Sequence, residues 1–284
     1  MKIRSSHIPY LLILPAVAYL AFFIGYPLIQ ALYLAFTKNG AFSLDTVRRA
    51  TSDPMFWQAL KYTILLAITI VPLQLILALI LALAVNGSFK GRDFAIYALV
   101  IPLTISDVAA GLIWYTMLAD YGFLNKLLLN LGLISEPIHF FGYEYRMMEF
   151  LAIVIAEVWR ATAIVFVILV AGLQMISKEY LEAAEVFGAG YWTRLRKIVI
   201  PMLKPSIQSA LIIRTLFAMQ VFGIVWILAG RDIPVLAGEG FYQLVEIKDY
   251  GVASIYALTI AALSILLGAL YIKFLKAEYL EVRT

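Results

Sequence analysis

Residues 177–206 read SKEYLEAAEVFGAGYWTRLRKIVIPMLKPS, a polar stretch between two long apolar ones. Ser177 has a side chain that can cap a helix N-terminus by accepting a hydrogen bond from a backbone amide. Acidic residues follow it, where the positive end of the helix dipole favours negative charge. These acids are Glu179, Glu182 and Glu185. The pattern predicts a helix that begins directly after Ser177.

Glycines and prolines divide the rest of this stretch. Gly188 and Gly190 can end the first helix by adopting left-handed backbone angles. A second, basic helical stretch covers 192–199, and Pro201 and Pro205 then close the loop and start the next apolar segment. We therefore predict a rigid, exposed helix–turn–helix. A hairpin lying on the lipid surface is the alternative, but an anionic leaflet would repel its acids, which favours a protein partner.

Outward from this hairpin the chain is apolar over six stretches, each close to or above the roughly 20 residues that a helix needs to cross a bilayer. They are residues 10–36, 62–85, 94–118, 150–175, 207–229 and 252–275. The first is longer than the roughly 7–15-residue core of a secretory signal, which indicates a retained span. We predict an all-α integral membrane protein with six transmembrane helices, in which residues 1–284 form a single domain.

The composition agrees with a membrane environment. Of 284 residues, 63% are hydrophobic and 14% are charged, whereas a soluble domain carries about a quarter charged residues. The chain has no cysteine and two histidines, His7 and His139, which excludes a disulfide framework and a Cys/His metal cluster. His139 precedes two phenylalanines and is interpreted as a surface or interfacial residue. No metal site is predicted.

The basic residues orient the spans, because cytoplasmic loops are enriched in Lys and Arg. The two ends, the loop 86–93 and the hairpin carry twelve of them and a net charge of +6. The opposite segments carry eight basic residues, ten of the eighteen acids and a net charge of −2. Both termini are therefore predicted to be cytoplasmic. This topology explains the overall charge of +4 without nucleic acid as a partner.

Four charged residues fall inside the predicted spans, where they require a partner or a water-filled cavity. They are Asp107, Glu157, Arg160 and Arg214. Their formal charges sum to zero, and Glu157 and Arg160, three residues apart, share a helix face and can pair. Nearby polar and aromatic side chains could contact a sugar: Trp114, Trp159, Phe217 and Gln220. The charges could instead form buried pairs that fix helix register, and the residues alone leave both interpretations open.

The hairpin carries a specific motif. Glu182, Ala183 and Ala184 are followed after three residues by Gly188 and, nine residues later, by a segment that runs from Ile198 to Pro201. This resembles the EAA signature of bacterial and archaeal ABC importer permeases, E-A-A-x3-G-x9-I-x-L-P. The single departure is Ile200 in place of leucine, a swap of similar volume. In that family the segment is the coupling helix that contacts a separate ATPase subunit.

The resemblance covers nearly the whole chain. It includes LLILPAVAYLAFFIGYPLIQALYLAF at 11–36, DPMFWQALKYT at 53–63, VPLQLILALILALAVNGSFKGR at 71–92 and IPLTISDVAAGLIW at 101–114. These stretches look like the first permease of carbohydrate importers of the maltose, trehalose and glycerol-phosphate type. The resemblance implies a type I ABC importer permease fold, with 177–206 as the coupling loop. The coupling residues it implies are Glu182, Ala183, Ala184, Gly188, Ile198 and Pro201.

The resemblance also implies the function and the partners. The chain would form half of the pathway of a sugar importer in the cell membrane of a bacterium or archaeon, without catalysing a reaction. A second permease, two ATPase subunits that bind ATP and Mg²⁺, and an extracytoplasmic sugar-binding protein would complete the complex. The sugar would be a mono-, di- or oligosaccharide such as trehalose or maltose, with glycerol phosphate as the alternative. The resemblance places Asp107, Glu157, Arg160, Arg214 and Phe217 at or next to the family's sugar site. Gln220 is added to the predicted substrate contacts for its amide group, which can hydrogen-bond a sugar hydroxyl.

Two other function classes compete with this interpretation. An ion-coupled secondary transporter could use the intramembrane acids, but it would give the hairpin no role. A membrane enzyme would need a nucleophile and a base, and the spans contain neither cysteine nor histidine. The chain contains no G-x-x-x-x-G-K-[ST] motif, so an ATPase that drives it would be a separate polypeptide.

Overall fold

A computed structural model describes residues 8–274. Basic residues used in the orientation prediction, Lys2, Arg4, Lys276 and Arg283, lie outside this range, as do His7 and the last residue of the predicted span 252–275. The described chain is helical apart from turns and one small hairpin of two strands, β1 Thr37–Lys38 and β2 Ala41–Phe42. The all-α prediction is confirmed.

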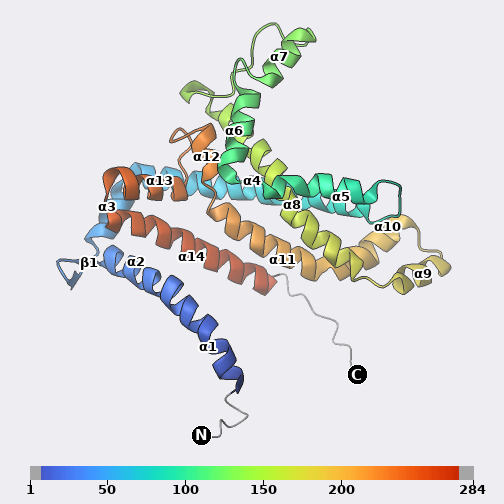
Figure 1. Ribbon diagram of the computed structural model, residues 1–284, viewed down its shortest axis with the longest axis horizontal. Helices are drawn as coiled ribbons and strands as arrows, with labels where there is room; N and C mark the ends of the chain where they lie inside the picture. The colour runs from blue at the N-terminus through green and yellow to red at the C-terminus, as the bar shows by residue number, and fades with distance from the viewer. Residues whose placement is uncertain (1–7, 275–284) are drawn as a thin grey trace.

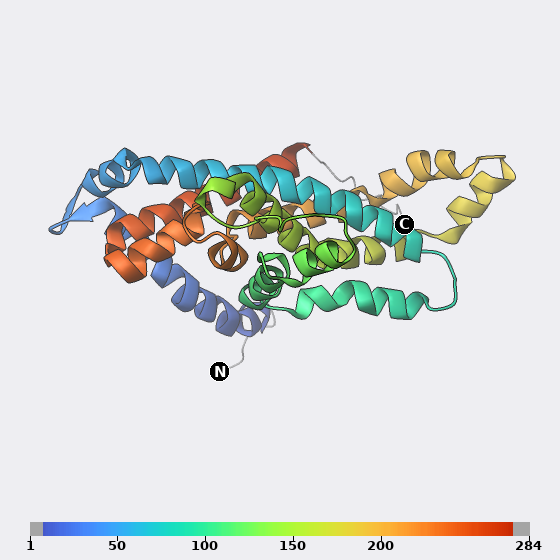
Figure 2. The same cartoon turned by 90° about the horizontal axis from the view of Figure 1, so that it is seen from above.

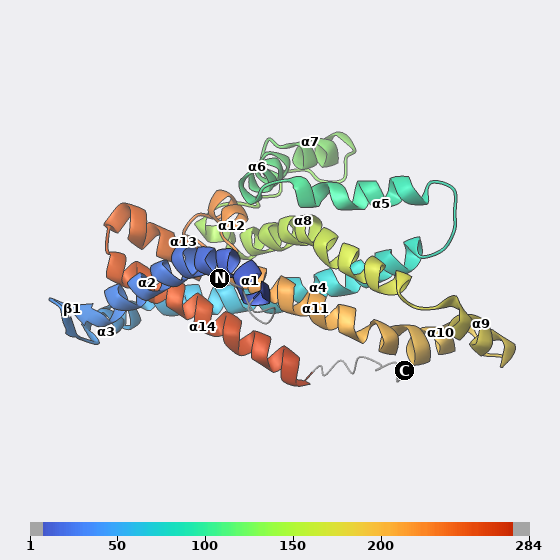
Figure 3. The same cartoon turned by 60° about the horizontal axis from the view of Figure 1, so that its bottom comes forward.

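Long helices form the body of the molecule and run side by side along its long axis (Figure 1). They are α4 Pro54–Val85, α8 Arg146–Gln174, α11 Ile200–Met219 and α14 Tyr250–Phe274. The shorter α5, Arg92–Val100, lies beside α8 (Figure 3). Alanines on α4, among them Ala67, Ala78 and Ala82, are buried and let neighbouring helices approach closely.

The remaining elements are shorter. On the N-terminal side they are α1 Ile8–Leu20, η2 Ala21–Gly25, α2 Tyr26–Phe36, α3 Asp45–Ser52, η3 Ile101–Thr104, α6 Asp107–Leu118, α7 Phe123–Asn130 and η4 Tyr143–Tyr145. On the C-terminal side they are α9 Lys178–Val186, α10 Tyr191–Arg194, η5 Leu195–Val199, α12 Gly223–Leu228, α13 Leu236–Tyr242 and η6 Gln243–Ile247. Helices α6 and α7 project from the body, and α1 diverges from it at the opposite side (Figure 1).

By length and composition, four described helices can cross a membrane: Leu12–Phe36, Pro54–Val85, Tyr143–Gln174 and Tyr250–Lys273. The pair Arg92–Thr104 and Asp107–Asn130, bent by 102°, would make a fifth. The count of six is thus not confirmed. The helix α11 is absent from this group because Lys204, Gln208 and Arg214 lower its hydropathy, although it packs between α8 and α14.

Two predicted spans are broken, and their prediction as continuous helices was wrong. The span 94–118 bends at Ile105, whose backbone is extended, and α6 restarts with Ser106 as its cap. The span 207–229 ends at Met219 and resumes as α12. Its helix α11 also begins earlier than predicted, at Ile200, so that 200–206 belongs to the helix rather than to the loop.

The two broken spans pack against each other. A Cβ atom on Gly111 of α6 would lie 2.9 Å from Ile227 Cβ, and one on Gly223 of α12 would lie 2.7 Å from Asp107 Cβ. Contacts this close admit only glycine without a shift of the neighbouring residues. The breaks in the two spans are thereby held next to each other inside the body.

A similar close approach joins α8 to α11 at Gly172. We expect Gly172→Val to lower the melting temperature of the purified protein by several degrees, because its Cβ would lie 2.2 Å from Ser206 Oγ and 2.9 Å from Leu203 Cδ1. The matched control is Gly268→Val in α14, where a Cβ meets nothing within 4 Å. Equal melting temperatures for the two variants would contradict this packing.

The segment after α6 forms the short helix α7. In this helix Asn125 is fully buried: its Oδ1 accepts from the Ile138 amide at 2.8 Å, and its Nδ2 donates to the Ile138 carbonyl at 2.9 Å. One amide side chain thus ties α7 to the segment that returns to α8.

Candidate functional site

A cavity of about 320 Å³ is lined on one side by residues at the two helix breaks. All six side chains predicted as substrate contacts line it: Asp107, Glu157, Arg160, Arg214, Phe217 and Gln220. They come from α6, α8, α11 and the break that follows α11. The remaining lining residues are Leu103, Ala161, Ile164 and Val221. A volume of this size lies at the lower end of the range for small-ligand pockets.

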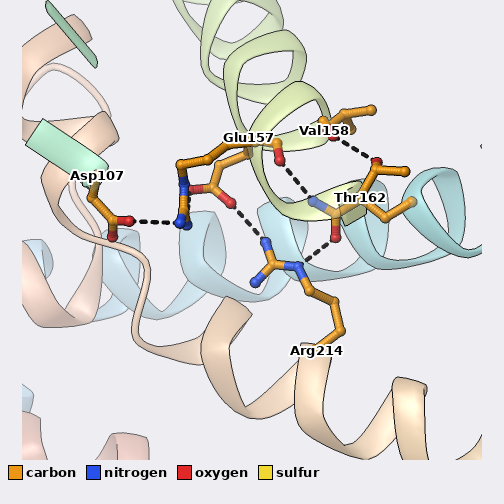
Figure 4. A network of polar contacts seen from close by, with 7 residues as sticks. Asp107, Glu157, Val158, Thr162 and Arg214 are labelled. Carbon is orange, nitrogen blue, oxygen red and sulfur yellow. Dashed lines mark hydrogen bonds and ion pairs between the residues drawn. The ribbon is translucent and has the colours of Figure 1, made fainter. Parts of the chain in front are cut away.

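A buried polar network lies at the inner side of this cavity (Figure 4). The Arg214 guanidinium donates from Nη2 to Glu157 Oε2 at 2.6 Å and from Nε to Gln74 Oε1. Gln74 Nε2 in turn donates to the Glu157 carbonyl oxygen at 2.8 Å. These three residues are at most 2% exposed. The network joins α4, α8 and α11, so it fixes their mutual register.

A second ion pair lies nearer the opening. Arg160 Nη1 is 2.9 Å from Asp107 Oδ1, and Arg160 Nη2 is 3.3 Å from Glu157 Oε1. The predicted pairing of Glu157 with Arg160 is therefore confirmed. The Asp107 side chain is 43% exposed and that of Arg160 is 16% exposed. Charge therefore alternates from Asp107 through Arg160 and Glu157 to Arg214.

The intramembrane charged residues differ in how deeply they are buried. Glu157 and Arg214 form the buried structural pair, with little surface left for a ligand. Asp107, Arg160, Phe217 and Gln220 retain surface towards the cavity. Phe217 is 55% exposed, which leaves a ring face free to pack on the apolar C–H face of a sugar.

Gln74 was not predicted from the sequence as part of this site. The available signal was an amide inside the apolar stretch 62–85 of α4, since a buried amide requires partners. Trp114 and Trp159, suggested as sugar contacts, do not line the cavity. Their rings pack edge to face with centroids 5.9 Å apart, and Trp159 lines a neighbouring apolar cavity instead.

The hairpin extends from one end of the molecule (Figure 2). Ser177 Oγ accepts from the Glu179 amide at 3.3 Å, which confirms the predicted cap of α9. Gly188 has φ +79°, as expected for the residue that ends the helix. The same expectation for Gly190 was wrong: it has φ −66° and precedes α10 instead.

The predicted coupling residues lie on different sides of the hairpin. Glu182, Ala183 and Gly188 are exposed, Ala184 and Ile198 are partly buried, and Pro201 lies in the first turn of α11. Glu182 also lines a cleft of about 650 Å³ between α9 and the body, together with Arg92 and Lys178. The two helices of the hairpin are joined by an ion pair of 3.0 Å between Glu185 and Arg194.

The tip of the hairpin is apolar and exposed. The side chains of Val186, Phe187 and Trp192 are 85%, 89% and 72% exposed. Exposed apolar patches of this kind are typical of interaction surfaces.

Within residues 8–274, no group of three or more His, Asp or Glu side chains could hold a metal ion. His139 lies 3.0 Å from Asp120 and is about half exposed, consistent with the predicted surface position.

Comparison with known proteins places this architecture in a family. Residues 62–277 match the family described as "binding-protein-dependent transport system inner membrane component". The trehalose/maltose transport system permease protein of Thermococcus litoralis is 30% identical over 96% of this chain and 95% of its own length. The sulfoquinovosyl glycerol transport system permease protein of Agrobacterium fabrum is 32% identical over 94% and 90%.

The fold also agrees with a solved structure. A chain of a bacterial ABC transporter that imports the acidic polysaccharide alginate superposes with a TM-score of 0.82 over 96% of each chain, at 20% identity. A superposition over this share of the chain shows that the overall arrangement of helices is a known fold. The chain is therefore a member of the family of inner membrane components of binding-protein-dependent transport systems.

Proposed function

We propose that this chain is one permease subunit of an ATP-driven sugar importer and that the cavity between its two helix breaks binds the sugar during passage. The observation that carries the proposal is that side chains from α6, α8 and α11 converge on this one cavity. It combines hydrogen-bonding groups with the exposed ring of Phe217, which suits a polyhydroxylated ligand with an apolar face.

The relatives support a saccharide as cargo. Their names refer to trehalose and maltose, to lactose and, in a further case, to sn-glycerol-3-phosphate. A mono-, di- or oligosaccharide such as trehalose or maltose is the proposed cargo here, with glycerol phosphate as the alternative. A second permease would supply the other half of the pathway, and an extracytoplasmic binding protein would deliver the sugar.

The hairpin is proposed as the contact with a separate ATPase, which would bind ATP and Mg²⁺. Its two helices are joined by Glu185 and Arg194, and its second helix continues through η5 into α11. Because α11 carries Arg214 and Phe217, a displacement of the hairpin would reach the cavity along one element. Alternating access then requires that ATP and sugar stabilise two different arrangements of these helices.

The test is transport in vesicles that contain this chain, its second permease, the ATPase and the binding protein. We expect uptake of trehalose or maltose that depends on ATP. A variant that combines Glu182→Ala with Gly188→Val is expected to lose the co-purifying ATPase and the uptake. Gly268→Val serves as the control because a Cβ at that position meets nothing within 4 Å. Sugar accumulation without the ATPase chain would show an ion-coupled transporter instead.

A further inference from the structure

We propose that Asp107 sets the charge selectivity of the cavity: its ion pair with Arg160 reserves the site for uncharged, polyhydroxylated cargo. The inference rests on the proposed transport function. It concerns the preference of the site for neutral saccharides over saccharides that carry a carboxylate.

The first argument is the exposure of the charged groups. Glu157 and Arg214 neutralise each other inside the body, where both are at most 2% exposed. The charges that a ligand can reach are therefore those of Asp107, whose side chain is 43% exposed, and Arg160, at 16%. An anionic ligand would have to approach the Asp107 carboxylate to reach the guanidinium, and like charges in a partly desolvated site repel each other strongly.

The second argument is the hydrogen-bonding capacity of Arg160. Its Nη1 lies 2.9 Å from Asp107 and its Nη2 lies 3.3 Å from Glu157. Because Glu157 also pairs with Arg214, Asp107 is the carboxylate that compensates the positive charge of Arg160. Its Nε is buried and has no hydrogen-bond partner among the described residues. The Nη1 and Nη2 atoms each carry a second N–H, so Arg160, which lines the cavity, can donate to a neutral hydroxyl without needing a further negative charge.

The third argument concerns the alternative, in which the ion pair only holds α6 against α8. Asp107 is already positioned by backbone packing, since a Cβ on Gly223 would lie 2.7 Å from its own Cβ. The backbone on either side is ordered by the Ser106 cap, whose Oγ accepts from the Ala109 amide at 3.2 Å. The carboxylate of Asp107 is thus not required to place the start of α6, and Asp107→Asn is expected to fold.

The experiment measures sugar binding to the purified complex of this chain with its second permease and ATPase, without the binding protein. The probes are trehalose, maltose and a form of each with one 6-hydroxymethyl group oxidised to a carboxylate. We expect the wild-type complex to prefer the neutral sugars. Asp107→Asn should raise the affinity for the carboxylated sugars relative to the neutral ones by about ten- to hundredfold, the range of one charge-assisted hydrogen bond.

Two further variants provide a second test and a control. Arg160→Gln should shift selectivity further against the carboxylated sugars, because Asp107 then faces the cavity uncompensated. Asp45→Asn is the matched control: Asp45 is also ion-paired, its side chain is 39% exposed, and it does not line the cavity. It should leave selectivity unchanged.

The outcomes separate the inference from the function on which it rests. Unchanged selectivity in folded Asp107→Asn and Arg160→Gln, with neutral sugars still bound, overturns the role of Asp107 and leaves the sugar site intact. A wild-type complex that binds none of the four sugars overturns the proposed sugar function itself.

Discussion

Replacing Glu157 with leucine is expected to destabilise the folded chain by about 3–5 kcal/mol, enough to prevent recovery of intact protein from the membrane. The change leaves the Arg214 guanidinium at 2% exposure without its counter-charge and removes one of the two carboxylates beside Arg160. A charge stranded in this way costs far more than the pair contributes. The measurement is the yield and melting temperature of the complex after size-exclusion chromatography.

A second substitution tests the cause. Combining Glu157→Leu with Arg214→Met removes both buried charges and should recover a large part of the lost stability, although Gln74 then loses its Arg214 partner. The matched control is Glu185→Leu, which breaks the exposed pair with Arg194 and is expected to change stability by less than about 1 kcal/mol. A Glu157→Leu protein as stable as the Glu185→Leu protein would contradict the buried network.

The tip of the hairpin is expected to dominate the affinity for the ATPase. Phe187→Ser combined with Trp192→Ser should weaken binding of the ATPase at least about a hundredfold, since a buried aromatic anchor contributes about 2 kcal/mol or more to an interface. The side chains are 89% and 72% exposed, so the fold of the permease does not depend on them. The measurement is ATPase binding to the immobilised permease pair, with sugar-dependent transport as a second readout.

The control for this variant removes equally exposed aromatic side chains elsewhere. Phe42 on the small strand hairpin and Tyr121 before α7 are 76% and 85% exposed, and neither lies in α9 or α10. Phe42→Ser combined with Tyr121→Ser should leave ATPase binding unchanged. Equal effects of the two double variants, or unaltered binding by the tip variant, would exclude the tip as the principal contact.

Much of the architecture followed from local patterns. Apolar stretches near the length of a bilayer predicted the long helices α4, α8 and α14, because in lipid the backbone must satisfy its own hydrogen bonds. The cap at Ser177 and the left-handed Gly188 followed from side-chain chemistry within a few residues. Local signals were insufficient at Gly190. It was predicted to end α9, but it is the residue that precedes α10 and has an extended backbone.

The broken spans show where hydropathy fails as a guide. Residues 94–118 and 207–229 are apolar on both sides of their breaks, so a count of apolar residues treats each as one helix. The break near Ile105 is instead a property of packing, in which α6 turns away and fits against α12 at Gly111 and Gly223. The same interruption allows Asp107 to reach Arg160.

The sequence by itself determined which residues cannot face lipid, because a charge in a membrane span needs a partner wherever the helix lies. It named Asp107, Glu157, Arg160 and Arg214 on that ground. Only the tertiary structure decided which of these side chains are buried and which remain exposed, because the exposure of a side chain depends on helices that are distant in the sequence. Gln74 and Arg214 are 140 residues apart, yet their contact encloses Glu157 and leaves Asp107 and Arg160 facing the cavity.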